Sequence, residues 1–257
     1  MSALLLLSSC APALVRLPAG PGAPAPDAAD ALSQATAVCR GVRTLTAEAG
    51  VSGRVGGERV RGRMTIGVAA PASARIEAVA PFGAPIFIFT AVDNDATLLL
   101  TRENRVLEHG PSDRVLEAVA GVPMDAAALR LALAGCASPN ADPSRARQLG
   151  LDWRVIPDGA ADVYLHRENG SWRPIATEHH GAIEWRAEYR AFQPSGLPQS
   201  IRFVSVDRGR FDLQLELSQV DTNTTLGPEV FRVQIPASAQ RITIDELQHA
   251  RPGIREN

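Results

Sequence analysis

The chain has 257 residues, of which 45% are hydrophobic and 21% are charged, which suits one large globular domain with appendages. Its 26 basic residues, all of them arginine, face 28 acidic ones, and the net charge is −2. A chain so balanced has no overall positive field, which argues against binding to nucleic acid through its net charge.

The first ten residues have the pattern of an export signal. An apolar run over residues 3–7 ends in small residues, as secretory signals do. The stretch Leu7-Ser8-Ser9-Cys10 resembles a bacterial lipobox, in which the cysteine is acylated and begins the mature protein. We therefore expect residues 1–10 to be a lipoprotein signal peptide, with Cys10 as the lipid anchor; a start upstream of Met1 would complete it. No later run approaches the roughly 18 to 20 apolar residues of a membrane span.

Residues 11–27 are rich in proline and glycine and show no apolar period. This composition predicts a semi-extended tether between the anchor and a folded domain. Asp27 or Asp30 then caps a helix that we expect to reach Arg40, with Leu32 and Cys39 on one face.

From Thr44 onward, apolar residues recur at every second position, the pattern of strands with one dry face. Two helices interrupt this pattern. Ser112 begins the first, which ends at Gly121, and Asp125 caps the second, which ends before Gly135. The strands predicted before these helices lie near 44–54, 59–66, 73–80, 85–91, 96–101 and 104–108.

Strands resume after the helices, near 151–156, 161–167, 171–178, 183–190 and 211–217. Asn169-Gly170, between two of them, is the strongest short signal for a hairpin turn. We expect a last strand at residues 230–235 and a short helix at residues 245–247.

These elements predict an α+β fold: a single antiparallel sheet of about eleven strands, curled into a half-barrel. The helices would form a lid over an apolar cavity, a common form of ligand site. The side chains expected to line this cavity are Leu45, Val51, Val60, Met64, Ile66, Ile76, Leu116, Val119, Leu129, Leu133, Trp185, Tyr189, Phe203, Phe211, Leu213 and Leu215.

Catalytic motifs are missing from the sequence. There is no nucleophile elbow, no phosphate-binding glycine loop and no zinc-protease motif. His179 and His180 are neighbours on a predicted strand, so they point to opposite faces and do not readily share a metal. Asp162 and His166 share a face but lie roughly 13 Å apart along the strand. We therefore expect a protein that is not an enzyme and that has no metal and no cofactor.

Four arginines, at positions 54, 59, 61 and 63, lie on the wet faces of two adjacent predicted strands. They fit either of two interpretations. One is a solubilising surface, and the other is contact with anionic lipid headgroups.

Acylation of Cys10 would leave Cys39 and Cys136 as the remaining thiols. An export route leads to an oxidising compartment, where the two either pair or stay as buried free thiols. A bridge would close a loop of roughly 100 residues and contribute about 4 kcal/mol in the chain-entropy model.

An ordered series of short motifs resembles the LolB-like outer-membrane lipoprotein receptors of the LolA/LolB superfamily, and their DUF4292-type relatives. The series covers residues 28–221, and residues 222–257 form an extension whose strand and helix look like the end of LolA. The cysteine pair is a departure from the LolB pattern. The motifs are VSGR at 51–54, RGR at 61–63, APFG at 80–83, VLEAVAGVP at 115–123, LRLALAG at 129–135 and LPQSI at 197–201.

The resemblance implies a half-barrel whose cavity receives lipoprotein acyl chains from a LolA-like periplasmic carrier. It also implies that an apolar residue in the turn Pro81-Phe82-Gly83, here Phe82, contacts the membrane. We thus expect a monomer, lipid-anchored in the outer membrane and facing the periplasm, that binds acyl chains of lipoproteins or phospholipid and delivers them. The alternative is a structural or assembly lipoprotein that holds a protein partner.

Overall fold

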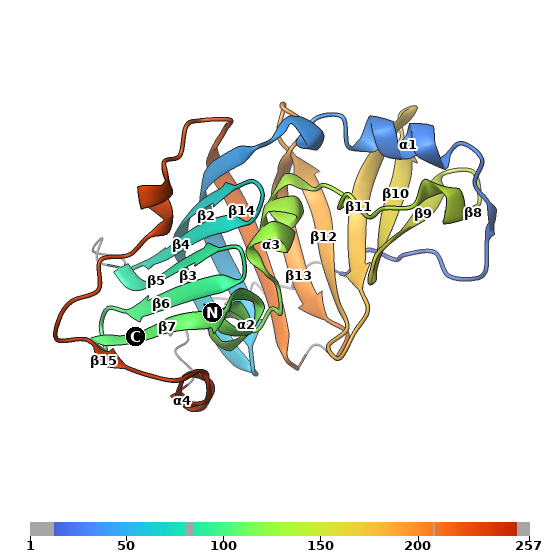
Figure 1. Ribbon diagram of the computed structural model, residues 1–257. Helices are drawn as coiled ribbons and strands as arrows, with labels where there is room; N and C mark the ends of the chain where they lie inside the picture. The colour runs from blue at the N-terminus through green and yellow to red at the C-terminus, as the bar shows by residue number, and fades with distance from the viewer. Residues whose placement is uncertain (1–12, 81–84, 208, 251–257) are drawn as a thin grey trace, which may run out of the picture.

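The chain winds into one open, curled sheet with helices packed on one face (Figure 1). The computed structural model describes residues 13–80, 85–207 and 209–250. The elements are β1 (Ala23–Pro24), α1 (Ala28–Ala35), η1 (Cys39–Gly41), β2 (Thr44–Val55), β3 (Glu58–Ala69), β4 (Ser73–Val79), β5 (Pro85–Val92), β6 (Asp95–Leu100), β7 (Arg105–Pro111), α2 (Ser112–Ala120), α3 (Ala126–Ala134), η2 (Pro143–Arg145), β8 (Arg147–Leu149), β9 (Trp153–Asp158), β10 (Ala161–Glu168), β11 (Ser171–His179), β12 (Trp185–Phe192), β13 (Pro198–Ser205), β14 (Phe211–Thr222), η3 (Pro228–Phe231), β15 (Gln240–Arg241) and α4 (Ile244–Ala250).

The strands follow one another in the sheet in the order β1-β8-β9-β10-β11-β12-β13-β14-β2-β3-β4-β5-β6-β7-β15. Neighbours are antiparallel, except that β15 runs parallel to β7. We call the face that carries α2 and α3 the concave face, and the opposite one the convex face.

The sheet has fifteen strands rather than the predicted eleven. The strands β1, β8 and β15 are two or three residues long, too short to show a period of two. The strand predicted at residues 230–235 is wrong: a 3-10 turn and irregular chain lie there, and the strand comes later, at β15. Pro228 and Pro236 flank this segment, and the guanidinium of Arg75 binds its carbonyl groups at Val230 (3.0 Å) and Arg232 (2.8 Å). The segment is therefore held in place by the Arg75 side chain and not by backbone hydrogen bonds to a neighbouring strand.

The helices in the middle of the chain begin and end as predicted. Gly121 and Gly135 adopt left-handed conformations with φ of 77° and 65°, which glycine tolerates best and which ends each helix. The side chain of Asp125 accepts a hydrogen bond from Ala128 N at 2.7 Å and caps α3. The helix α1, by contrast, ends at Ala35 and not at Arg40. A 3-10 turn, η1, follows and carries Cys39.

Both ends of the described chain wrap around an edge of the sheet. At one edge, Leu17 packs on the convex face against Val155 and Tyr164, β1 then pairs with β8, and α1 covers the concave side. At the other edge, residues 233–239 pack on the convex face against Leu99 and Val106, and β15 pairs with β7. The helix α4 then packs beside α2 on the concave side. Each edge is thus covered by chain, which protects its unpaired backbone groups.

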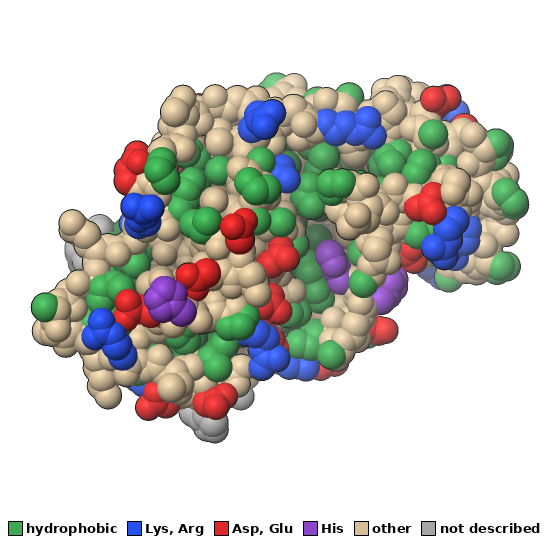
Figure 2. All heavy atoms as spheres, in the orientation of Figure 1, with side chains coloured by type: hydrophobic (Ala, Val, Ile, Leu, Met, Phe, Trp, Pro, Cys, Tyr) green, Lys and Arg blue, Asp and Glu red, His purple; other side chains and the backbone are tan. Residues whose placement is uncertain are grey.

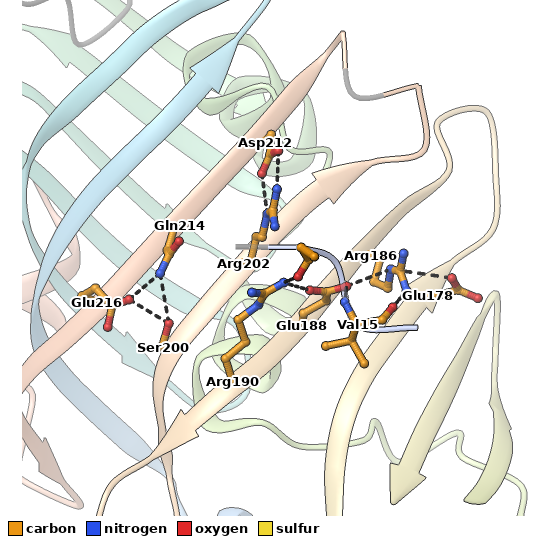
Figure 3. Close-up of polar contacts among 11 residues, drawn as sticks. Val15, Glu178, Arg186, Glu188, Arg190, Ser200, Arg202, Asp212, Gln214 and Glu216 are labelled. Atoms are coloured by element: carbon orange, nitrogen blue, oxygen red, sulfur yellow. Dashed lines mark hydrogen bonds and ion pairs between the residues drawn. The ribbon is translucent and has the colours of Figure 1, made fainter. Parts of the chain in front are cut away.

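The stretch predicted to be a tether packs on strand β12 from Ala13 onward (Figure 3). Its contacts centre on Glu188, whose side chain is 0% exposed. Val15 N donates to this carboxylate at 3.0 Å, and Arg190 Nη2 pairs with it at 2.7 Å. Arg186 and Arg190 in turn donate to the carbonyl oxygens of Val15 and Ala13. A buried carboxylate is costly without such partners, so these bonds hold the segment on the sheet.

A disulfide joins Cys39 in η1 to Cys136 just after α3, with the Cα atoms 5.6 Å apart. It ties the end of the helical cover to the chain that enters β2. The two cysteines are 97 positions apart in the sequence. The bridge therefore closes a loop long enough to restrict the unfolded chain strongly.

We predict that the double variant Cys39→Ala, Cys136→Ala has a free energy of unfolding lower by about 4 kcal/mol, because its unfolded chain regains the closed loop's entropy. Urea unfolding followed by circular dichroism measures this. The unmodified protein under reducing conditions should match the variant. Equal stability of oxidised protein and variant would contradict the prediction.

Candidate functional site

A cleft with a volume of about 670 Å³ opens on the concave face. It lies between the β2–β3 hairpin, the end of α2 and the start of β14. Apolar side chains form one part of its lining and charged ones another. The apolar ones include Val51, Val60, Met64, Phe87, Val119 and Leu213, and the charged ones are Glu58, Arg59, Arg114, Glu117 and Arg210.

The position of α2 depends on a close approach at its end. A Cβ atom on Gly121 would lie 3.0 Å from Val55 Cγ1 and 3.4 Å from Phe211 Cβ. Glycine at this position therefore lets the end of α2 rest against the hairpin and against β14. Figure 2 shows the concave face, where acidic and basic side chains surround α2 and hydrophobic side chains lie in a hollow beside α3.

The charged residues of the cleft form a loose bridge across it. Glu117 on α2 lies 3.7 Å from Arg114 and 3.6 Å from Arg210, which belongs to the loop before β14. The two arginine side chains are 54% and 50% exposed, so each pair contributes little to stability. A polar rim of this kind separates at small cost, while the apolar floor stays fixed in the sheet. The site thus suits an elongated apolar ligand with a polar end.

The structure divides the predicted cavity residues into three groups. Val51, Val60, Met64, Val119 and Leu213 line the cleft, and Tyr189 lines a smaller cavity. The others pack in the main core without lining either: Leu45, Ile66, Ile76, Leu116, Leu129, Leu133, Trp185, Phe203, Phe211 and Leu215.

A period of two identifies the face on which a side chain lies, but not whether a helix fills the space above it. Sequence reasoning missed three of the charged residues of the cleft, Arg114 and Glu117 on α2 and Arg210 in the loop before β14. It also missed Phe87, because residues 85–89 are all apolar and show no alternation that distinguishes the two faces of β5.

The smaller cavity, of about 140 Å³, lies between α3 and strands β10 to β12. His179 lines it and stacks on Trp185 with ring centroids 3.8 Å apart. Burial lowers the pKa of His179 to about 4, against a weaker opposing effect of Asp158. The neighbouring His180 lies 3.4 Å from Asp162, which belongs to the opposite, convex side of the strands. The two histidines thus lie apart, as their adjacency on a strand predicts.

Other candidate groups do not converge. His166 contacts Glu168 at 3.3 Å and Trp153 through its ring, away from Asp162. Within residues 13–80, 85–207 and 209–250, no group of three or more His, Cys, Asp or Glu side chains is placed to hold a metal ion.

In the same ranges, no helix has the length and apolar character to cross a membrane. The predicted anchor Cys10 and the predicted membrane contacts Pro81, Phe82 and Gly83 lie outside the described residues.

We predict that His179 makes stability depend on pH. Its folded pKa lies below the unfolded value of about 6.5, so the unfolded state binds more protons as the pH falls. Stability is then complete above that unfolded value and declines toward pH 4. From about pH 7.5 to about pH 5, the protein should lose about 2 kcal/mol more than the variant His179→Phe, which keeps a stacking ring.

Urea unfolding at the two pH values measures this difference. The variant His180→Phe provides the control, because it keeps His179 and removes only the smallest of the effects on the pKa of His179, so it should keep most of the pH dependence. An unchanged pH dependence in His179→Phe would contradict the prediction.

No family model and no curated protein matches the sequence. Solved structures do match in fold. A LolA superfamily protein of Nitrosomonas europaea has a TM-score of 0.56 at 11% identity, over 80% of this chain and 97% of that one. A putative outer membrane lipoprotein-sorting protein domain of Vibrio parahaemolyticus has 0.50 at 12% identity, over 79% and 94%. A DUF1329 family protein of Desulfovibrio piger has 0.50 at 9%, over 82% and 98%. The chain therefore has a LolA/LolB-like fold.

Proposed function

We propose that this protein binds the acyl chains of lipoproteins or lipids in its cleft and delivers them to the outer membrane. The observation that carries the proposal is the cleft itself, with an apolar floor in the sheet and a charged rim at its mouth. Its volume of about 670 Å³ lies within the range of small-molecule sites. An acyl chain would lie on the floor while the polar end of the ligand stays at the rim.

The energetics of such binding need no covalent step. Each buried CH₂ group contributes about 0.8 kcal/mol, so ten of them would contribute about 8 kcal/mol. A bilayer offers the same gain for the same groups, so the ligand can leave the cleft for the membrane without ATP. We therefore propose a carrier or receptor and not an enzyme, acting without metal or cofactor.

Fold and disulfide together support a place in the cell envelope. A protein with the same fold is described as an outer membrane lipoprotein-sorting domain. The Cys39–Cys136 bridge belongs to an oxidising compartment such as the periplasm. We propose that acylated Cys10 anchors the protein in the outer membrane, with a LolA-like periplasmic carrier as the donor of its ligand.

One observation favours the alternative, a lipoprotein that holds a protein partner. Much of the concave face is filled: ten of the predicted cavity residues pack in the core, among them Trp185 and Phe203, whose rings meet edge to face. A filled face leaves less room for acyl chains than a fully open half-barrel. Ligand binding decides between the two functions.

We predict that the delipidated protein binds a fluorescent fatty acid at micromolar concentration, and that Met64→Trp weakens this binding. Met64 lines the cleft, and the larger indole would occupy part of it. Displacing two methylenes corresponds to about 1.6 kcal/mol, or a roughly tenfold to fifteenfold loss of affinity.

The matched control is Leu151→Trp, at a position 85% exposed and outside the cleft, which should bind as the unmodified protein does. Thermal unfolding of both variants checks that the fold is kept. Absence of probe binding to the unmodified protein would contradict the acyl-chain proposal and favour the alternative, a lipoprotein that holds a protein partner.

A further inference from the structure

The chain ends cover the flanks of the convex face and leave its middle open. Residues 13–17 lie over β9 to β12, and residues 230–239 lie over β4 to β7. Between them, alternate side chains of β2 and β3 are exposed, from Glu48 to Arg54 and from Arg59 to Thr65. This open surface is therefore available to a partner, as far as the described residues show.

Four arginines gather on this open surface, Arg54 from β2 and Arg59, Arg61 and Arg63 from β3. We call them the arginine strip. Arg54 lies directly opposite Arg59, while Arg61 and Arg63 face Ser52 and Gly50. Successive arginines along β3 are about 7 Å apart. Like charges directly opposite one another destabilise a sheet, and small neighbours leave the other guanidinium groups uncovered.

Three carboxylates beside the strip are engaged elsewhere, while Glu48 lies at the far end of the open surface, opposite Thr65. Asp212 lies opposite Arg54 in register but binds Arg202 through two contacts of 2.6 Å. Glu77 pairs with Arg75, and Glu216 accepts hydrogen bonds from Ser200 and Gln214. Among the described residues, no member of the strip forms an ion pair.

The strip is a local feature, because the net charge of the whole chain is −2. It thus concentrates positive charge that the protein as a whole lacks. One end of the strip adjoins the cleft, because Arg59 belongs to the strip and also lines the cleft, together with the hairpin residues Val55, Gly56 and Glu58.

We propose that the arginine strip docks the protein on an anionic lipid bilayer through the phosphate groups of its lipids. Arginine binds phosphate through a planar fork of donors, and basic residues near an anionic surface each add to the attraction. Docking by this strip brings the β2–β3 hairpin, which borders the cleft, to the membrane surface. The use of this position for ligand delivery rests on the proposed function, whereas the binding of the strip to the bilayer does not.

The test uses the full chain with Cys10→Ser, so that no acyl anchor contributes, and vesicles of phosphatidylcholine with or without phosphatidylglycerol. We expect binding only to the anionic vesicles, and loss of that binding at high salt, which screens exposed charges. The strip variant Arg54→Gln, Arg61→Gln, Arg63→Gln keeps Arg59, because Arg59 also lines the cleft, and should weaken binding roughly 100-fold.

The matched control changes the same number of charges at dispersed, exposed positions: Arg40→Gln, Arg102→Gln and Arg145→Gln. It should bind within about threefold of the unmodified chain, because only clustered charges act together on the surface. Equal losses in both variants, or no loss in the strip variant, would overturn the proposal.

Binding of the fluorescent fatty acid shows whether a failed experiment contradicts bilayer docking by the strip or contradicts the proposed binding of acyl chains. The strip variant should keep its affinity for the probe, which shows that it is folded and that the cleft is intact. Vesicle binding without any probe binding would support docking by the strip and contradict the proposed binding of acyl chains.

Discussion

An open sheet with one apolar face must be covered, and the helices of this protein are too short to cover all of it. Fifteen strands at about 4.8 Å spacing make a sheet roughly 65 Å wide along its curve. The helices α2 and α3 have nine residues each and are therefore only about 14 Å long. Much of the architecture follows from this mismatch. The main core lies where these helices meet the sheet, and the cleft lies where the end of α2 leaves part of the floor uncovered.

The chain ends complete the cover that the helices begin. Each end packs on the convex face, adds a short strand to an edge and finishes with a helix on the concave face. Among the described residues, the two ends leave the middle of the convex face open, and four of the exposed strand positions there carry arginine. The cleft and the arginine strip thus both lie where the sheet is left uncovered. The cleft is largely apolar and lies on the concave face, and the strip is cationic and lies on the convex face.

The sequence predicts the parts of this fold that repeat a period and misses the parts that depend on contacts between distant segments. The alternation in β2 and β3 fixes which side chains face the core, and the capping residues Asp125 and Gly135 fix the limits of α3. Nothing local marks Ala23–Pro24 as a strand, because its partner β8 is more than a hundred residues away. The same holds for the residues around Val15, whose docking requires the buried Glu188. Core and cleft residues look alike in sequence, since both are apolar positions on one face.

The docked N-terminal segment changes how an anchored domain would sit at a membrane. A free tether of some seventeen residues would let the domain rotate in any direction, whereas the observed contacts begin at Ala13. With the proposed anchor at Cys10, only Ala11 and Pro12 separate the lipid from the part of the chain held to the sheet. The segment lies over β12 on the convex face (Figure 3), which is also the face that carries the arginine strip. Anchor and strip would then favour one orientation, with the convex face toward the bilayer. The cleft lies on the other face, so a ligand would leave it past the end of the β2–β3 hairpin, which borders both the cleft and the strip.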